Sequence, residues 1–169
     1  GRKFIIFASS LMIIYSLSSV FISAYLFNQH TLEPYKEQVQ KIPSWAHRVI
    51  IWEFTSNKAI EKLPLGYGMD TSRKIGEETS PRASIFYNNL LPLLPLHPHN
   101  SSLQLYLELG LIGILLFNLI IFGLTKDILK IKDKVLQAIG FNIISNAYLI
   151  MHISYGIWQT WFLSGLWLS

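Results

Sequence analysis

The stretch FIIFASSLMIIYSLSSVFISAYLF, residues 4–27, decides the fold, because none of its 24 side chains is charged. As a helix it would be about 36 Å long, which is enough to cross a hydrocarbon core of about 30 Å with some tilt. Residues 103–124 form a second apolar run, interrupted by Glu108 and Asn118, and residues 135–153 form a third. The sequence therefore predicts an all-α integral membrane protein.

The composition agrees with this class. Of 169 residues, 51% are hydrophobic and 14% are charged, whereas about 25% are charged in an average globular protein. Such a chain is not disordered, and the absence of cysteine excludes disulfides and thiolate chemistry. The net charge of +4 does not form one basic patch, so no nucleic-acid partner is expected. The chain begins with Gly1 and has no signal-peptide pattern, so we expect it to belong to a longer protein.

The region after the second run is too long for one further crossing. Residues 135–169 would form a helix of about 52 Å, so we expect a break near 154–156. Residues 157–169 carry three tryptophans and are interpreted as an aromatic interfacial segment or the start of a fourth span. Polar residues within the third run should face protein along one side; these are Gln137, Asn142, Ser145, Asn146 and His152.

Positive charges predict the orientation. Arg2 and Lys3 precede the first span, and four lysines lie in or beside the connecting loop predicted at 125–134. Because short basic flanks stay in the cytoplasm, residues 28–102 should form an extracytoplasmic loop of 75 residues. The expected architecture is a single membrane region, 1–169, with three to four transmembrane helices and one large, partly helical loop.

The large loop has a predicted order of its own. Ser44 could cap an amphipathic helix over 45–62. The sequence PLGYG at 64–68 has turn chemistry and should end this helix. Residues 69–84 are polar and are expected to form a loop, and residues 89–98 contain three prolines that return the chain to the membrane.

The tetrapeptide His97-Pro98-His99-Asn100 precedes the second span. Pro98 favours an extended conformation at His97, so the two imidazoles are expected to point apart. One histidine could act as a proton acceptor near neutral pH. Alternatively, both could be interfacial residues that cap the helix. A metal pair is a third option, but it has no obvious third ligand.

Two further groups of residues could carry chemistry. Glu108 is an intramembrane carboxylate, which is either functional or reaches back to the interface or an arginine, and Gly110 and Gly113 would allow close helix approach. Arg48 and Trp52 are four residues apart, so guanidinium and indole could stack. An arginine in this loop could bind diphosphate through its donor fork or be a solvated surface charge. Arg73 could add positive charge or, with Glu77 and Glu78 nearby, only solvate the loop, and the glycines of the PLGYG turn could let backbone approach a ligand.

The order and spacing of these motifs resemble a known family. His99-Asn100, nine residues, and then the glycines at 110 and 113 resemble the H-[NSQ]-x9-G-x-x-G signature of the bacterial O-antigen ligase superfamily. Arg48-x-x-x-Trp52 followed by PLGYG is similar to the R-x-x-x-W…P-x-x-G-x-G segment in that family's periplasmic loop. The aromatic segment at 154–161 resembles the aromatic segment that ends many proteins of that family. The resemblance implies the C-terminal third of a polytopic glycosyltransferase of the GT-C type in the bacterial inner membrane, with the large loop in the periplasm.

The resemblance also implies an activity and roles for residues. It implies a metal-independent, inverting glycosyltransferase without a cofactor, which takes a glycan from undecaprenyl diphosphate and transfers it to a sugar hydroxyl of lipid A–core. His99 would be the base, or would at least orient the acceptor hydroxyl, and Arg48 would neutralise the diphosphate. Glu108 would fix an arginine or His99 from one turn below. Substrate-binding residues would be Arg73, Asn100, Glu108, Gly66 and Gly68, and Gly110, Gly113 and Trp52 would belong to the structural motif.

Several functions stay open. O-antigen polymerases and protein-directed O-oligosaccharyltransferases of the same superfamily share the histidine region. In another class, the chain would be part of a polysaccharide transporter or flippase, with Glu108 and His152 as polar pathway residues. A structural membrane scaffold would tolerate changes at both His99 and Arg48.

Overall fold

The computed structural model describes residues 1–79, 82–84, 87–154, 156–159 and 164. In chain order the elements are α1 (Arg2–Leu26), α2 (Gln29–Leu32), η1 (Glu33–Tyr35), α3 (Lys36–Gln40), α4 (Pro43–Glu61), α5 (Ser72–Glu78), β1 (Arg82–Ser84), β2 (Tyr87–Leu91), α6 (Ser101–Lys130) and α7 (Lys134–Ile153).

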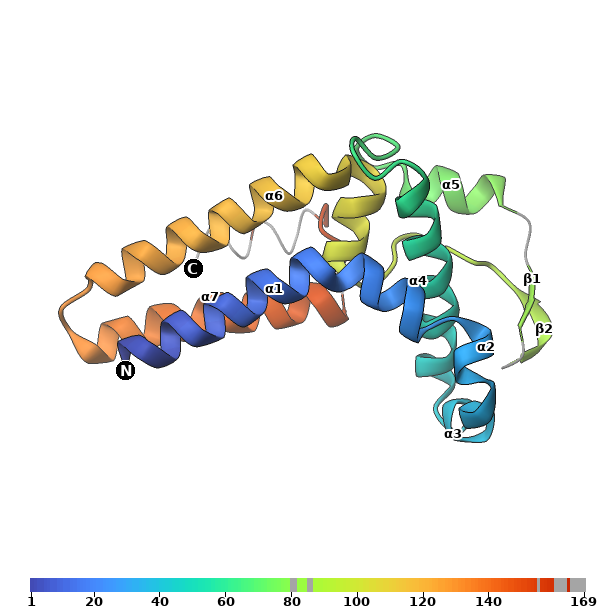
Figure 1. Ribbon diagram of the computed structural model, residues 1–169, viewed down its shortest axis with the longest axis horizontal. Helices are drawn as coiled ribbons and strands as arrows, with labels where there is room; N and C mark the ends of the chain where they lie inside the picture. The colour runs from blue at the N-terminus through green and yellow to red at the C-terminus, as the bar shows by residue number, and fades with distance from the viewer. Residues whose placement is uncertain (80–81, 85–86, 155, 160–163, 165–169) are drawn as a thin grey trace.

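Three helices, α1, α6 and α7, are long and apolar enough to cross a membrane. They form an elongated bundle, and the shorter elements gather at one end of it (Figure 1). The predicted all-α membrane architecture is therefore confirmed. The second run was predicted to end at 124, but α6 continues to Lys130, so only residues 131–133 connect it to α7. Asp133 caps α7, because its Oδ1 accepts from the backbone N–H groups of Val135 and Leu136 at 2.7 and 3.0 Å.

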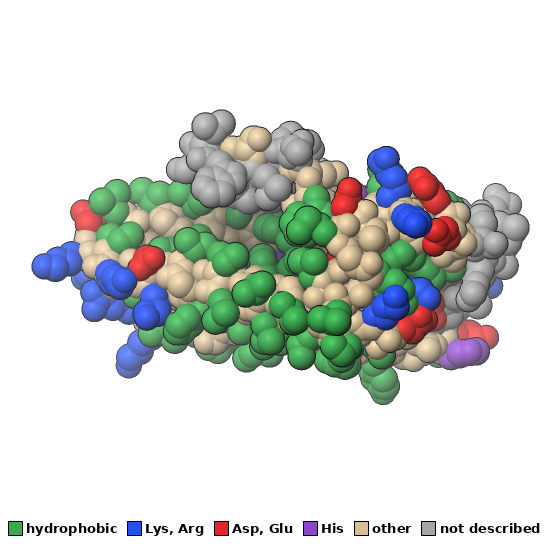
Figure 2. Space-filling view, turned by 90° about the horizontal axis from the view of Figure 1, so that it is seen from above, with side chains coloured by type: hydrophobic (Ala, Val, Ile, Leu, Met, Phe, Trp, Pro, Cys, Tyr) green, Lys and Arg blue, Asp and Glu red, His purple; other side chains and the backbone are tan. Residues whose placement is uncertain are grey.

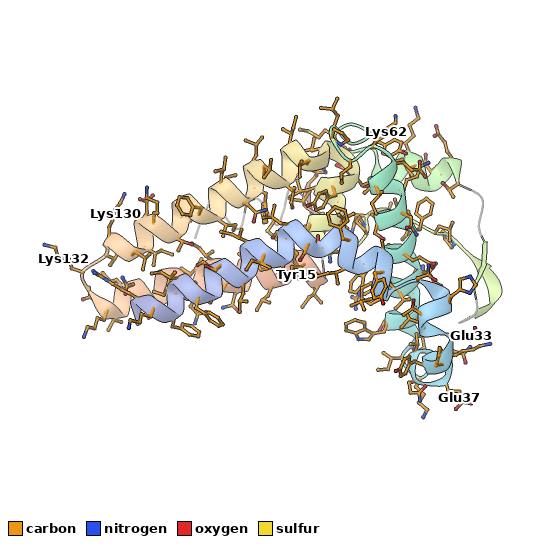
Figure 3. The ribbon with its side chains drawn as sticks, in the orientation of Figure 1. Tyr15, Glu33, Glu37, Lys62, Lys130 and Lys132 are labelled. Atoms are coloured by element: carbon orange, nitrogen blue, oxygen red, sulfur yellow. The ribbon has the colours of Figure 1, made fainter. Side chains whose placement is uncertain are left out.

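Charged side chains separate toward the two ends of the bundle. Lys130 and Lys132 lie at the end that also holds the N-terminus, whereas Glu33, Glu37 and Lys62 lie at the opposite end (Figures 1 and 3). Hydrophobic side chains cover the length between them (Figure 2). Both basic flanks therefore share one side of the bundle, as their charge pattern predicts. The assignment of that side to the cytoplasm stays a prediction.

Buried hydroxyl groups connect the three spans. Ser9 of α1 accepts a hydrogen bond from Thr125 of α6 at 3.0 Å. Ser16 of α1 and Tyr148 of α7 lie 2.9 Å apart, and Tyr106 of α6 donates to the backbone carbonyl of Leu17 at 2.6 Å. Polar pairs of this kind satisfy side chains that would otherwise be costly in an apolar surrounding.

The helix α6 is broken at Gly110, whose φ of 64° and ψ of −153° are not helical. Residues 101–109 turn away from the axis of the remaining span and pack beside α4 (Figure 1). This first part is almost wholly buried, and its Leu103 and Leu107 are fully enclosed. The span predicted at 103–124 is therefore two helical segments that meet at Gly110, where glycine readily adopts a backbone conformation that other residues avoid.

The extramembrane loop differs from its prediction in two places. The helix α4 begins at Pro43 and not after a Ser44 cap, because proline is favoured at the first helical position, where its missing N–H is not needed. Residues 69–84 were expected to be loop, but Ser72–Glu78 form α5 and residues 82–84 pair with 87–91 as an antiparallel hairpin.

The end of α7 agrees with its prediction. The helix stops at Ile153, where the backbone was expected to break. Gln137 and His152 are buried, whereas Asn142 and Asn146 are exposed, so only part of the polar side faces protein. The possible further span predicted at 157–169 lies largely outside the described residues.

Candidate functional site

The turn that precedes α6 brings His97 and His99 together. Their ring centroids lie 4.3 Å apart, with the ring planes at 68°. The expectation that they point apart is wrong, because it assumed extended backbone throughout. His99 has a φ of 53°, in the left-handed region, so the chain reverses there and its ring returns toward His97.

Hydrogen bonds define the proton positions on His97. The backbone N–H of His99 donates to His97 Nδ1 at 3.2 Å, so Nδ1 is the unprotonated nitrogen and the proton lies on Nε2. Burial, with a smaller contribution from the nearby His99, lowers the pKa of His97 to about 4. His97 is therefore a neutral donor near pH 7, and its lone pair is already used.

His99 has the opposite arrangement. Its Nδ1 lies 3.1 Å from the backbone carbonyl oxygen of Ser154. A carbonyl oxygen can only accept, so Nδ1 carries a proton, and in the neutral ring the lone pair lies on Nε2. The ring is half-buried. A carbonyl that orients imidazole in this way leaves the other nitrogen free to accept a proton.

Asn100 starts α6 and connects it to α1. Its Oδ1 accepts from the backbone N–H of Leu103 at 3.2 Å, and its Nδ2 donates to the hydroxyl of Tyr15 at 3.0 Å. Asn100 is 1% exposed. The side chain thus caps the helix that follows His99, and contact of Asn100 with substrate stays a prediction.

The helix α4 brings Arg48 to the same end of the molecule. The indole N–H of Trp52 donates to the carbonyl of Pro98 at 2.8 Å, which joins α4 to the histidine turn. The predicted stacking of Arg48 on Trp52 is not observed among the described residues. The Trp52 ring instead contacts Phe27 and Trp45. Arg48 is partly buried and forms no ion pair with a described carboxylate.

His47 is a neighbour that the sequence analysis missed. Burial lowers its pKa, and the nearby His99 lowers it further, while a hydrogen bond with the Pro92 backbone opposes both effects. Its Nε2 is buried and has no partner among the described residues. The signal was present in the sequence, because His47 directly precedes Arg48 in the R-x-x-x-W motif.

The two glycine motifs meet each other. The break at Gly110 frees backbone groups of α6, and the PLGYG turn satisfies them. The N–H groups of Tyr67 and Gly68 donate to the carbonyls of Leu107 and Glu108 at 2.9 and 2.8 Å, and the N–H of Leu111 donates to Leu63 at 2.7 Å.

These contacts correct the role predicted for Gly110. A Cβ on Gly110 would lie 2.6 Å from Leu63 O and Leu65 N. Gly110 therefore admits the backbone of a turn and not a neighbouring helix, while a Cβ on Gly113 would meet the Leu109 side chain. Gly66 approaches the backbone of Glu108 and Leu109 equally closely. Binding of substrate by Gly66 and Gly68 stays a prediction.

Glu108 is fully buried and holds three segments together. Its carboxylate accepts from the backbone N–H of Asp70 at 2.8 Å, from both the N–H and the hydroxyl of Ser72, and from Gln104 Nε2 at 3.0 Å. The indole N–H of Trp158 also donates to it. The expected partners were an arginine or His99. The observed donors are neutral and satisfy the charge in place.

A cavity of about 390 Å³ lies beside this network. Asp70, Arg73, Lys74 and Glu77 line it from α5 and the turn before it, and His97 and Trp158 line it from the other segments. Arg73 is exposed and forms no ion pair with a described carboxylate. Of the predicted site residues, the structure thus places Arg73 in this cavity, whereas Arg48 and His99 are not among its described lining residues.

A second cavity, of about 840 Å³, lies at the opposite, lysine-rich end between α1 and α7. Its walls include Phe4, Met12 and Phe141, with Asn142 and Asn146 beside them. Among the described residues, no group of three or more histidines or carboxylates could hold a metal ion.

The comparisons with known proteins agree with the motifs. The family described as O-antigen ligase matches residues 1–118. A protein of Rickettsia prowazekii (strain Madrid E) named "Putative polysaccharide ligase" is 46% identical over 128 residues, which is 75% of this chain and 31% of that protein. A protein of the same name from Rickettsia conorii (strain Malish 7) is 44% identical over 126 residues, which is 74% of this chain and 30% of that protein.

The chain thus spans about a third of the length of these relatives. No solved structure matches it. The family match covers more than half of the chain and includes α1, α4, the PLGYG turn, the histidine turn and the break in α6. On this match, and with the membrane helices that the structure describes, the chain belongs to the O-antigen ligase family.

Proposed function

We propose that this protein takes part in a glycosyl transfer from a lipid-linked glycan, and that His99 is the general base. The observation that carries the proposal is the hydrogen bond between His99 Nδ1 and the carbonyl of Ser154. It leaves Nε2, which has no hydrogen-bond partner among the described residues, as an acceptor on a ring that is held by the backbone at the end of α7. The donor is a glycan on undecaprenyl diphosphate, and the acceptor is a sugar hydroxyl of lipid A–core.

The reaction is a single displacement. The acceptor oxygen attacks the anomeric carbon, the bond from that carbon to the diphosphate oxygen breaks, and His99 Nε2 takes the hydroxyl proton. The configuration at the anomeric carbon inverts because one displacement occurs. General base catalysis typically contributes about 10²–10⁴-fold.

Arginine neutralises the lipid diphosphate that leaves. Arg48 lies on α4, which the Trp52–Pro98 hydrogen bond fixes beside the histidine turn. Its guanidinium forms no ion pair with a described carboxylate, so its charge is available to an anion. A planar donor fork matches phosphate oxygens better than an ammonium group does. No metal ion is required in this scheme.

The structure gives less support to a transport function. That function would use Glu108 and His152 as exposed polar groups along a pathway. Both are instead buried and hydrogen-bonded, with His152 Nε2 2.7 Å from the hydroxyl of Ser102. Polymerases and protein-directed transferases differ from the proposed ligase in the acceptor, which analysis of the reaction products identifies.

The test uses His99→Asn, because asparagine tolerates the left-handed backbone at this position but offers no basic nitrogen. We expect loss of glycan transfer to lipid A–core in a complemented knockout, read as lipopolysaccharide banding at equal membrane levels on an immunoblot. His30→Asn is the matched control, because His30 is exposed in α2. Wild-type banding from His99→Asn would contradict the proposal. If the wild-type protein produces lengthened glycan and not capped lipid A–core, the acceptor is another glycan. If it produces glycosylated protein, the acceptor is a protein.

Arg48→Lys tests the arginine. It keeps the charge but loses the fork, so transfer should fall severely while the protein still accumulates. Arg2→Lys, at the opposite end of the bundle, should transfer normally (Figure 1). Normal transfer by Arg48→Ala would show that this residue is only a surface charge.

A further inference from the structure

The cavity beside His97 has the size of a small-molecule site. Its volume of about 390 Å³ falls in the range of about 300–1,000 Å³ that such sites occupy. It lies at the end of the molecule that carries α5 and the histidine turn (Figure 1). Its walls combine one aromatic side chain with several polar ones, so both apolar and hydrogen-bonding contacts are available to a ligand.

The charges in this cavity balance. Arg73 and Lys74 are basic, whereas Asp70 and Glu77 are acidic. Asp70 and Glu77 form no ion pair with the described residues. A diphosphate placed here would meet both carboxylates, which disfavours it. A neutral ligand with many hydroxyl groups can donate to the carboxylates and accept from the guanidinium.

Trp158 supplies a wall of fixed orientation. Its indole N–H donates to the buried carboxylate of Glu108, which is itself held by Asp70, Ser72 and Gln104. Gln104 Oε1 also accepts from the backbone N–H of Ile157 at 2.9 Å, which anchors the segment that carries the indole. An indole held in this way presents a rigid apolar body to the cavity.

Polar groups of known direction complete the wall. His97 carries its proton on Nε2, and the amide of Gln159 lies 3.4 Å from that nitrogen. The buried Oε1 of Gln159 has no partner among the described residues. Turning the amide by half a turn places this oxygen where it accepts from the Nε2–H of His97, so these two atoms are paired.

We infer that this cavity is a saccharide subsite, which binds one pyranose ring with Trp158 as its stacking platform and Asp70, Arg73 and Glu77 as partners of the hydroxyl groups. The inference rests on the proposed function, because it names the sugar class that the transferase holds. The ring could belong to the donor glycan or to the acceptor, which have the same chemistry here.

The experiment measures binding separately from transfer. The intact protein in nanodiscs is mixed with methyl pyranosides of glucose, galactose and mannose, and saturation transfer to their ring protons is followed by NMR. For ligands of this size we expect a dissociation constant on the order of 1 mM. Inorganic pyrophosphate should not compete. Binding of none of the three sugars, or displacement by pyrophosphate, would overturn the inference.

Two variants distinguish stacking of a sugar on the Trp158 ring from the hydrogen bond that Trp158 donates to Glu108. Trp158→Phe and Trp158→Leu both lose the indole N–H, but only phenylalanine keeps an aromatic face. We expect Trp158→Phe to bind within about threefold of wild type and Trp158→Leu to weaken binding by about tenfold or more. Equal loss in both variants would mean that Trp158 acts only through Glu108 and would overturn the platform role.

A third variant keeps this inference distinct from the proposed function. His99→Asn should abolish transfer and leave sugar binding unchanged. Transfer that depends on His99 without any sugar binding would refute the subsite alone, and sugar binding that depends on Trp158 without transfer would refute the transferase alone. In Trp158→Leu, a raised KM for the acceptor assigns the ring to the acceptor, and a raised KM for the donor assigns it to the donor.

Discussion

Replacing Gly110 with alanine should strongly destabilise the junction between the PLGYG turn and α6. Gly110 has a φ of 64° and a ψ of −153°, a conformation that costs a residue with a side chain about 1–3 kcal/mol. The added Cβ would lie 2.6 Å from Leu63 O and Leu65 N and 2.7 Å from Gly66 N. All three are backbone atoms, so no flexible side chain can move aside.

The second cost is steric. Overpacking of an enclosed site typically costs about 1–3 kcal/mol, so the two effects together amount to about 2–6 kcal/mol. If the turn moves away to relieve the clash, the hydrogen bonds from Tyr67 and Gly68 to α6 are lost as well. Each bond typically contributes about 0.5–1.5 kcal/mol, so relaxation does not restore the lost stability.

The assay compares thermal unfolding of the purified protein in detergent micelles. Gly123→Ala is the matched control, because Gly123 lies in the same helix and an added Cβ there meets nothing within 4 Å. Removing a helical glycine should be neutral or stabilise by up to about 1 kcal/mol. We expect Gly110→Ala to unfold well below wild type and Gly123→Ala to match or exceed it. Equal unfolding temperatures for wild type and Gly110→Ala would refute the claim that the packing of the PLGYG turn on α6 requires glycine at this position.

Three other predictions follow from the charges and the histidines. Single cysteines at Lys62 and Lys132 should differ in labelling by an impermeant reagent in intact spheroplasts, with only Lys62→Cys labelled; the reverse result would invert the topology. The pKa of His97 is about 4 in the folded protein and about 6.5 in the unfolded chain. The free energy of unfolding should therefore fall as pH falls from 6.5 toward 4, and His97 should add no pH dependence above 6.5. Melting temperatures of His97→Gln should therefore depend less on pH than those of wild type over this range. Transfer should survive excess chelator, and its loss with recovery on added Mg²⁺ or Mn²⁺ would contradict the arginine-based scheme.

The membrane helices could be predicted from the sequence because their cause is local. A run of about 20 apolar residues satisfies its backbone within one helix, and the hydrocarbon core sets its length. The predicted spans at 4–27 and 135–153 therefore agree with Arg2–Leu26 and Lys134–Ile153 within two residues at each end. The order of the histidine, arginine and glycine motifs likewise predicted the family, since it needs only residue identities and spacings.

The contacts of the site could not be predicted in this way, because each joins residues far apart in the chain. The convergence of His97 and His99 depends on one left-handed residue and on the carbonyl of Ser154. Glu108 was recognised as costly, but its donors come from 70–72 and from Trp158, which only tertiary packing brings to it. Local sequence determined where the membrane helices form and which of their ends carry positive charge. The tertiary structure alone decided which nitrogen of each histidine faces a donor or an acceptor and which backbone fills the break at Gly110, because both depend on partners that sequence spacing does not specify.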